Sequence, residues 1–415
     1  MKSLFIHQNF PGQFRHLAAA LADMPENEVL AIGQADHLGR LRHPRVRELG
    51  YKTPRGAGNQ THHYLRSFEA QVRRGQQVVR LGNTLKQRGY HPDVICCHAA
   101  WGEGLYLREV WPDARLLYYF EFFYNNRGLD TGFDPEFPTT FDDRFRTPTR
   151  NANHLLSLHV ADWGISPTHW QHSTLPPEYQ SKVSVIFDGI NTTQVAPDET
   201  ASLRVNDNLV LTCRDEVISF VNRNLEPYRG YHIFMRALPR LMKERPDAHI
   251  VIIGGDEVSY GRLPTDGVSY RQRYLDEVKD QIDLDRVHFL GRVPYPTYLQ
   301  LLQVSSAHVY LTYPFVLSWS MLEAMSAGCA VVASATPPVK EVIRDEVNGL
   351  LFDFFSPDEL VDQVCRVLQH PDRMAAMREA ARSTIVEQYD LESVCLPQQL
   401  TLIQTLADGK TPDLT

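Results

Sequence analysis

The segment Ser305–Ala335, SSAHVYLTYPFVLSWSMLEAMSAGCAVVASA, decides the fold of this chain. Its two uncharged, β-branched runs predict buried strands at Val309–Tyr313 and Ala330–Ser334, covered by helices as in a parallel sheet. Between them a helix opens near Ser318 and carries Glu323. In parallel α/β sheets ligands bind where strands end and helices begin, and the free amides of a helix start suit a phosphate. This geometry predicts a nucleotide site, with backbone amides on the phosphates and Glu323 on a sugar hydroxyl.

The run from Glu323 to Gly328, Glu-Ala-Met-Ser-Ala-Gly, resembles the signature of retaining family-4 glycosyltransferases with the GT-B fold. That signature is a Glu, seven residues, and then Glu-Ala-Met-Ala-x-Gly. The resemblance implies that Glu323 holds the ribose of a sugar nucleotide. The first Glu of the signature, which usually touches the donor sugar, falls on Phe315, so the sugar-recognising half of the site is altered. From the residues alone, Glu323 could also be a solvated carboxylate on a helix.

The composition is that of a globular protein. At 415 residues the chain is long for one core and suits two. It is 43% hydrophobic and 22% charged, and no apolar run approaches the ~20 residues that span a bilayer. The first residues, Met1–Gln8, predict a strand rather than a secretory signal. The six scattered cysteines predict small buried thiols in a reducing compartment, so we expect a cytoplasmic protein.

The net charge of −8 hides a strongly basic segment. Between Arg40 and Arg88 there are twelve Lys and Arg residues, opposed only by Glu48 and Glu69. Such a segment attracts phospholipid headgroups, a lipid diphosphate or an acidic polysaccharide, and it also fits a solvated face kept soluble by its charge. Nucleic acid is disfavoured because no recognition motif accompanies the charge. The 40–88 stretch therefore predicts peripheral contact with an anionic membrane, at its inner face.

Strands alternate with helical patterns in both halves, which predicts two Rossmann-like, doubly wound parallel-sheet domains. The resemblance implies that they face a cleft, as in GT-B enzymes. We expect an acceptor-side domain over 1–194, a nucleotide-sugar-binding domain over 195–388, and a helix over 389–415 that returns to the first domain. The predicted strands are Leu4–Gln8, Val29–Ile32, Val94–Cys97, Leu116–Phe120, Val183–Phe187, Val217–Val221, His249–Ile253, Val287–Leu290, Val309–Tyr313 and Ala330–Ser334.

The segment Phe220–Gly230 carries a second motif. A strand ends, Arg223 and Arg229 lie six residues apart across a Pro-containing loop, and Gly230 begins a helix. Two guanidinium groups at a strand end could clamp a diphosphate through charge-assisted forked hydrogen bonds. The segment resembles the family's Gly-Arg…Lys-Gly element, with Arg229 at the Lys position but one residue further along. The resemblance implies that both arginines assist departure of the diphosphate.

Further donor-side candidates lie at turns after strands or at helix starts. Gly255 follows a strand and lets a nucleotide approach the backbone. Arg292 and Val293 lie in a strand-and-turn that, in the family, stacks near the base. Ser318, Trp319 and Ser320 begin the Glu323 helix and offer amides to the phosphates. Ordinary turn chemistry explains each of them equally well when it is taken singly.

The first domain contains candidates for the donor sugar and the acceptor. Gly12 and Gln13 lie in a loop, Phe10–Phe14, that resembles the family's glycine loop after the first strand. Glu121 stands where the family commonly has a His that reaches the transferred sugar, although a helix-capping carboxylate is a plainer explanation. His98 ends a strand and could equally be structural. We place Gly12, Gln13, His98 and Phe315 on the sugar and acceptor side, and Glu121 with the two arginines among the catalytic residues.

Together these features predict a retaining, metal-independent glycosyltransferase of hexosyltransferase type. It would move a sugar from a nucleoside diphosphate sugar to a saccharide or lipid-linked acceptor, in glycan or polysaccharide biosynthesis. No cofactor is expected beyond this co-substrate. Asp283-Leu284-Asp285 fits the Asp-x-Asp pattern of metal-dependent transferases, which GT-B enzymes do not normally use. The alternatives are a sugar-nucleotide epimerase or phosphorylase of the same fold, and a catalytically weak sugar-nucleotide-binding protein, which Phe315 favours.

Overall fold

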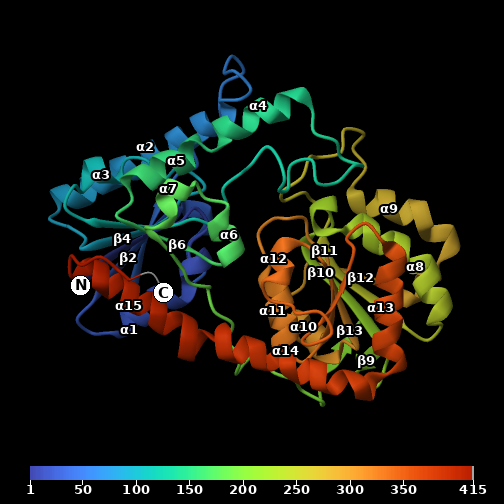
Figure 1. The fold of residues 1–415 in the computed structure, drawn as a ribbon. Coiled ribbons are helices and arrows are strands. Elements are labelled where there is room, and N and C mark those ends of the chain that lie inside the picture. Colours follow the sequence, from blue (N-terminus) through green and yellow to red (C-terminus); the bar gives the residue numbers. More distant parts are fainter. Residues whose placement is uncertain (414–415) are drawn as a thin grey trace. The chain divides into compact units, whose positions relative to one another are not determined.

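The computed structural model describes residues 1–413, which divide into two compact units. The first unit comprises Met1–Gly189 and the segment from Glu392 onward, and the second comprises Ile190–Leu391. Each unit is built on a parallel sheet flanked by helices (Figure 1). The predicted doubly wound α/β architecture is therefore confirmed. The structure divides the chain after residues 189 and 391, where the sequence placed the divisions after residues 194 and 388.

The first unit has a seven-stranded parallel sheet in the order β3-β2-β1-β4-β5-β6-β7. Adjacent residues of its strands point to opposite faces: Leu4 packs with side chains of α2, α3 and α5, whereas Phe5 packs with those of α1 and α15. The strands are β1 (Lys2–Ile6), β2 (Glu28–Gln34), β3 (Val46–Tyr51), β4 (Val94–His98), β5 (Arg115–Tyr119), β6 (Trp163–Ser166) and β7 (Val183–Val185). The helices are α1 (Arg15–Asp23), α2 (Arg66–Gln87), α3 (Leu107–Val110), α4 (Phe141–Arg150), α5 (Ala152–Val160), α6 (His169–Ser173), α7 (Pro177–Gln180) and α15 (Leu396–Ala407).

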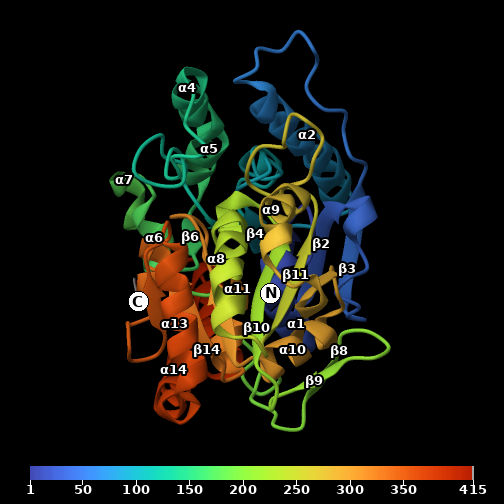
Figure 2. The ribbon, with the colours of Figure 1, turned by 90° about the vertical axis from the view of Figure 1, so that its right-hand side faces the viewer.

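The second unit has a six-stranded parallel sheet in the order β12-β11-β10-β13-β14-β15 and a separate antiparallel pair, β8-β9. Figure 2 shows α8, α11, α13 and α14 running beside its strands. The strands are β8 (Ser202–Arg204), β9 (Val210–Thr212), β10 (Val217–Asn224), β11 (His249–Gly255), β12 (Val287–Gly291), β13 (Ala307–Tyr310), β14 (Ala330–Ser334) and β15 (Leu350–Phe352). The helices are α8 (Tyr231–Glu244), α9 (Tyr270–Val278), α10 (Tyr295–Val304), α11 (Trp319–Ser326), α12 (Pro337–Lys340), α13 (Pro357–Gln369) and α14 (Ala375–Gln388).

Two differences from the sequence prediction have clear physical causes. The strand predicted through Tyr313 ends at Tyr310, because the next amides leave the strand ladder: Thr312 N–H donates to Ser334 Oγ (3.2 Å) and Tyr313 N–H donates to the carbonyl of Tyr228 (3.0 Å). The strand β3 was not predicted. It lies within the basic segment and is an edge strand that pairs only with β2, so its open side lets charged residues into its sequence.

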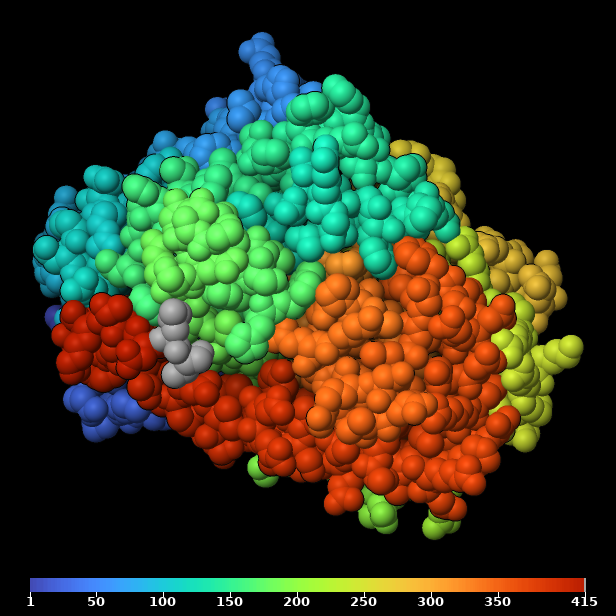
Figure 3. Space-filling model, viewed as in Figure 1, coloured from blue at the N-terminus to red at the C-terminus, as the bar shows by residue number. Residues whose placement is uncertain are grey.

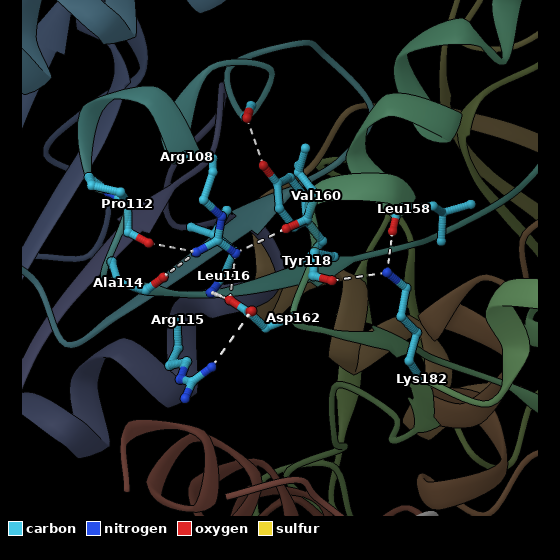
Figure 4. A network of polar contacts seen from close by, with 12 residues as sticks. Arg108, Pro112, Ala114, Arg115, Leu116, Tyr118, Leu158, Val160, Asp162 and Lys182 are labelled. Atoms are coloured by element: carbon cyan, nitrogen blue, oxygen red, sulfur yellow. Dashed lines mark hydrogen bonds and ion pairs between the residues drawn. The ribbon is translucent and has the colours of Figure 1, made fainter. Parts of the chain in front are cut away.

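The amino ends of β5 and β6 are held by a network around Arg108 (Figure 4). Its guanidinium donates to the carbonyl oxygens of Ala114 (2.9 Å) and Val160 (3.1 Å) and to Asp162 Oδ2 (2.7 Å). Asp162 Oδ2 also accepts from the N–H of Leu116 (2.7 Å). These bonds tie α3, α5 and the starts of two strands together. The network lies at the edge of the sheet opposite to the carboxyl ends of its strands.

Candidate functional site

The carboxyl edge of the second unit's sheet carries the start of α11. Ser318 caps this helix, since its Oγ accepts from the N–H of Ser320 (3.3 Å). The N–H of Ser318 itself donates to the hydroxyl of Tyr310 (2.9 Å), at the end of β13. Trp319 is 45% exposed. The first N–H groups of a helix lack intrahelical partners and favour an anion nearby. Two of the predicted donors, the N–H groups of Ser318 and Ser320, are bonded within the protein, so their contact with a phosphate stays a prediction.

Glu323 lies about one turn into α11, and its carboxylate is oriented by two tyrosines of α10. Its Oε1 accepts from the hydroxyl of Tyr295 (2.8 Å), and its Oε2 accepts from that of Tyr298 (2.7 Å). Burial raises the pKa of Glu323, and the two hydroxyl groups oppose that rise. Each carboxylate oxygen can accept a second hydrogen bond. The sequence analysis missed both tyrosines, although an aromatic pair three residues apart at the start of a helix was a usable signal.

Arg229 is 5% exposed and braces the loop between β13 and α11. Its Nη1 donates to Thr312 Oγ1 (2.7 Å) and to the carbonyl of Val316 (2.9 Å), and it lies 3.4 Å from the hydroxyl of Tyr310. The turn beside it needs a glycine: Gly230 has φ +65°, and a Cβ there would lie 2.3 Å from Cβ of Leu311. The sequence predicted Arg229 as a phosphate ligand, and that role stays a prediction; in the structure its guanidinium holds the loop between β13 and α11.

Phe315, at the position of the signature's first Glu, is 4% exposed and belongs to an aromatic cluster. Its ring centroid lies 5.0 Å from that of Tyr260 and 5.5 Å from that of Tyr228. The rings of Tyr260 and Phe315 lie 5.2 and 5.9 Å from the guanidinium carbon of Arg229. Tyr260 is held in turn by Glu226, a fully buried carboxylate that accepts from the N–H groups of residues 259–261. Phe315, in place of the signature's Glu, therefore adds a second aromatic ring, beside that of Tyr260, near the buried guanidinium of Arg229.

The remaining donor-side candidates occupy the same edge of the second unit's sheet. Arg223 is exposed near the end of β10. Arg292 follows β12, and its Nη2 donates to Asn224 Oδ1 (2.9 Å) and Glu257 Oε2 (2.5 Å). Gly255 makes room for that side chain, since a Cβ there would lie 2.7 Å from Arg292 Nε. Val293 is partly buried and packs against the apolar cluster beneath the edge, and its predicted place near the base stays a prediction.

In the first unit, a hydrogen-bonded chain joins His7, directly after β1, to Glu121, two residues after β5. The N–H of Asn9 donates to His7 Nδ1 (2.9 Å), so His7 Nε2 carries the proton and donates to Gln13 Oε1 (2.9 Å). Gln13 Nε2 then donates to Glu121 Oε1 (3.2 Å). Burial lowers the pKa of His7 to about 4, so the imidazole is neutral near pH 7. Gly12 permits the chain, because a Cβ there would lie 2.3 Å from His7 Nε2.

His98 lies beside this chain, at the end of β4. Its ring stacks between Trp101 and Tyr119, with centroid separations of 4.3 and 5.2 Å. Its Nδ1 accepts from the N–H of Ala100 (3.2 Å), which leaves the proton on Nε2. Within residues 1–413 this buried Nε2 has no hydrogen-bond acceptor, and Glu121 Oε2 lies 3.9 Å away. Burial holds the pKa of His98 well below its usual range. A neutral donor and a carboxylate, whose side chain is 33% exposed, thus stand side by side.

The structure therefore brings together Gln13, His98 and Glu121 in the first unit, with Gly12 beneath them. The sequence analysis missed His7 and Trp101, which complete this cluster. The signal for His7 was available, because it follows the first strand just as His98 ends the fourth. Within residues 1–413 no three His, Cys, Asp or Glu side chains gather as a metal site requires, and no helix is long and apolar enough to cross a bilayer.

Comparison with known families assigns both units. Residues 25–195 match the model of the glycosyl transferase family 4 group, and residues 210–384 match that of glycosyl transferases group 1. The chain belongs to glycosyltransferase family 4. The predicted resemblance is confirmed, and each match falls almost entirely within one unit.

Individual proteins show the same relationship. The chain is 27% identical over 218 residues to the uncharacterised glycosyltransferase MJ1607 of Methanocaldococcus jannaschii, over 52% of each chain. It thus spans about half the length of this curated relative. Its fold matches sucrose-phosphate synthase of Thermosynechococcus elongatus (TM-score 0.74, 18% identity, covering 98% of this chain and 100% of that one). It also matches Anabaena HepE in complex with UDP and glucose (TM-score 0.68, 18% identity, 98% and 100% covered). These likenesses confirm the GT-B fold.

The bracing role of Arg229 predicts that its removal destabilises the second unit. We expect Arg229→Ala to lower the free energy of unfolding by about 2–4 kcal/mol, since it leaves buried acceptors without their donor. The exposed Arg223→Ala should change it by less than about 0.5 kcal/mol. Urea unfolding of both variants measures this difference. Equal stability of Arg229→Ala and the wild type would contradict the bracing role.

Proposed function

We propose that this protein is a glycosyltransferase that moves a sugar from a nucleoside diphosphate donor to a saccharide or lipid-linked acceptor in glycan biosynthesis. The observation that carries the proposal is the convergence on one sheet edge of the capped start of α11, the signature carboxylate Glu323 and the Arg223–Arg229 element. HepE, which shares the fold, is described with UDP and glucose. A UDP-sugar is therefore the first donor to test.

In this proposal the second unit binds the donor. The N-terminal end of α11 and the exposed guanidinium of Arg223 hold the diphosphate, and Arg229 supports the loop that leads into α11. Glu323 accepts a hydrogen bond from a ribose hydroxyl, while Arg292 lies beside the base. Positive groups preorganised where the diphosphate gains charge lower the barrier to its departure, which is the usual large contribution in such catalysis.

We propose that the reaction keeps the anomeric configuration and needs no metal or further cofactor. The bond between the sugar C1 and the β-phosphate oxygen breaks, and the oxygen of the acceptor hydroxyl bonds to C1 from the same face. The proton of that hydroxyl passes to the departing phosphate oxygen. No protein nucleophile takes part, so the chain's contribution is binding, orientation and electrostatic stabilisation.

We assign the His98–Glu121 pair of the first unit to recognition of a sugar or acceptor hydroxyl. A hydroxyl beside both groups accepts from His98 Nε2, which otherwise lacks an acceptor, and donates to Glu121 Oε2. Gln13 and His7 act through Glu121, because their hydrogen bonds fix the position of its other oxygen. The basic 40–88 stretch adds the proposal that the acceptor is reached at the inner face of an anionic membrane.

The test is a screen of nucleoside diphosphate sugars with saccharide and lipid-linked acceptors, followed by mass spectrometry and NMR of the products. We expect transfer with retained configuration, unaffected by EDTA. Glu323→Ala should weaken UDP binding by about tenfold or more in calorimetry. Asp207→Ala, on the turn of the β8–β9 pair, is the matched control and should bind normally.

Several outcomes would contradict the proposal. A product with inverted anomeric configuration would contradict the retaining mechanism. Loss of activity in EDTA would contradict metal independence. An epimerised donor in the absence of acceptor would favour an epimerase. Tight UDP binding without turnover of any donor would favour a binding protein.

Replacing the carboxylate of Glu121 tests the first unit's role. We expect Glu121→Gln to lower the transfer rate at least about tenfold, because the amide cannot accept as a charged group does. UDP affinity should stay unchanged, since the residue lies outside the nucleotide site. The exposed Glu178→Gln, on α7 of the same unit, serves as control. A Glu121→Gln variant with wild-type kinetics would refute the assignment.

A further inference from the structure

The helices α4 and α5 of the first unit turn an apolar stripe toward solvent. The stripe is formed by residues 141, 145, 148, 155 and 156, which recur with the spacing of one helix face. Asn151 joins the two helices in helical conformation (φ −77°, ψ −7°). The exposed fractions are 76% for Phe141, 50% for Phe145, 39% for Leu155 and 46% for Leu156, and Pro148 is also exposed.

This pattern is the reverse of an ordinary surface helix, whose apolar face is buried in the core. No residue of α4 is buried, and the two phenylalanine rings contact each other, with centroids 4.7 Å apart. Asp142 accepts from the hydroxyl of Tyr64 (2.9 Å), and α2 contacts both α4 and α5 (Figure 1). Leu65, next to that tyrosine, adds a further side chain that is 46% exposed.

Basic residues outnumber acidic ones beside the stripe. Residues 141–160 contain three arginines and two acidic residues, and the segment 52–66, whose Tyr64 contacts Asp142 of α4, adds three Lys and Arg residues. Lys52, Arg55, Arg144 and Arg146 are exposed. Both acids have hydrogen-bond partners in the protein: Asp142, which is exposed, accepts from Tyr64, and Asp143 closes the capping box of α4 with Thr140. These segments therefore carry a net positive charge on exposed side chains, whereas the net charge of the whole chain is negative.

We propose that the first unit docks on an anionic lipid bilayer through the α4–α5 stripe, with Phe141 and Phe145 inserted at the headgroup boundary and the flanking arginines on lipid phosphates. Helices that lie in a membrane surface combine exposed aromatic and aliphatic side chains with flanking Lys and Arg in this way. Arginine suits the role because its planar guanidinium binds a phosphate with two hydrogen bonds. The space-filling view shows this part of the chain, in teal and green, at the molecular surface (Figure 3).

The positive charge beside the stripe favours an anionic bilayer, rather than a second copy of the chain, as its partner. In a symmetric dimer the same patch meets itself, so a face with net positive charge would meet another face with net positive charge. Pro148, in the middle of the stripe, also interrupts the regular packing that two helices require. An anionic lipid surface instead pairs the flanking arginines with phosphate groups. The docking is independent of glycosyl transfer, and it extends to α4 and α5 the membrane contact proposed from the 40–88 stretch.

The test is flotation of the full-length protein with vesicles, in the absence of any sugar nucleotide. We expect binding to mixed phosphatidylcholine and phosphatidylglycerol vesicles, weak binding to phosphatidylcholine alone, and loss of binding as salt rises. The double variant Phe141→Ser/Phe145→Ser should bind at least about tenfold more weakly. Leu263→Ser removes an equally exposed apolar side chain (73%) from the second unit and should bind like the wild type.

A tryptophan at the stripe gives an independent readout. The emission of Phe141→Trp, relative to the wild type, should shift to shorter wavelength on vesicle addition and be quenched by brominated lipids. Failure to bind mixed vesicles, or undiminished binding by the folded double serine variant, would overturn the proposal. A concentration-dependent dimer that the double variant abolishes would assign the stripe to a second copy instead. Because no donor is present, these outcomes are separate from those of the transfer assay.

Discussion

The buried guanidinium of Arg229 is the constraint on which the donor-side geometry depends. It holds the loop after β13 through Thr312 and Val316. Tyr310, the end of that strand, lies against the same guanidinium and accepts from the N–H of Ser318, the cap of α11. The direction of α11, and with it the position of Glu323, therefore follows from where this cation sits. A buried charge is costly unless it is fully hydrogen-bonded, and satisfying it ties strand, loop and helix together.

Both units gather their candidate site residues at the carboxyl ends of parallel strands. In the first unit, the Arg108–Asp162 network locks the amino ends of β5 and β6, whereas His7, His98 and Glu121 gather at the carboxyl ends of β1, β4 and β5. Parallel strands place all their carboxyl ends at one edge, so polar side chains far apart in sequence meet there. In the second unit the same rule collects residues of β10, β11, β12 and the start of α11.

Much of this arrangement could be predicted from the sequence because buried parallel strands are continuous apolar runs. The predicted strand Ala330–Ser334 coincides with β14, and Ser318 caps the helix that carries Glu323. The edge strand β3 was missed because one open side lets charge into its sequence. Tyr295 and Tyr298, the partners of Glu323, were missed because α10 and α11 come together only in the folded structure. The burial of Arg229 was unforeseen because arginines are rarely buried, and only the packed aromatic rings of Tyr260 and Phe315 reveal it.

The central claim, that the sheet edge around α11 binds the donor nucleotide, is tested most directly by a crystal structure of the protein with UDP. The account predicts phosphate oxygens at the N-terminal end of α11, beside residues 318–320, with a ribose hydroxyl on Glu323. UDP bound elsewhere on the protein, or bound here with its ribose turned away from Glu323, would contradict it.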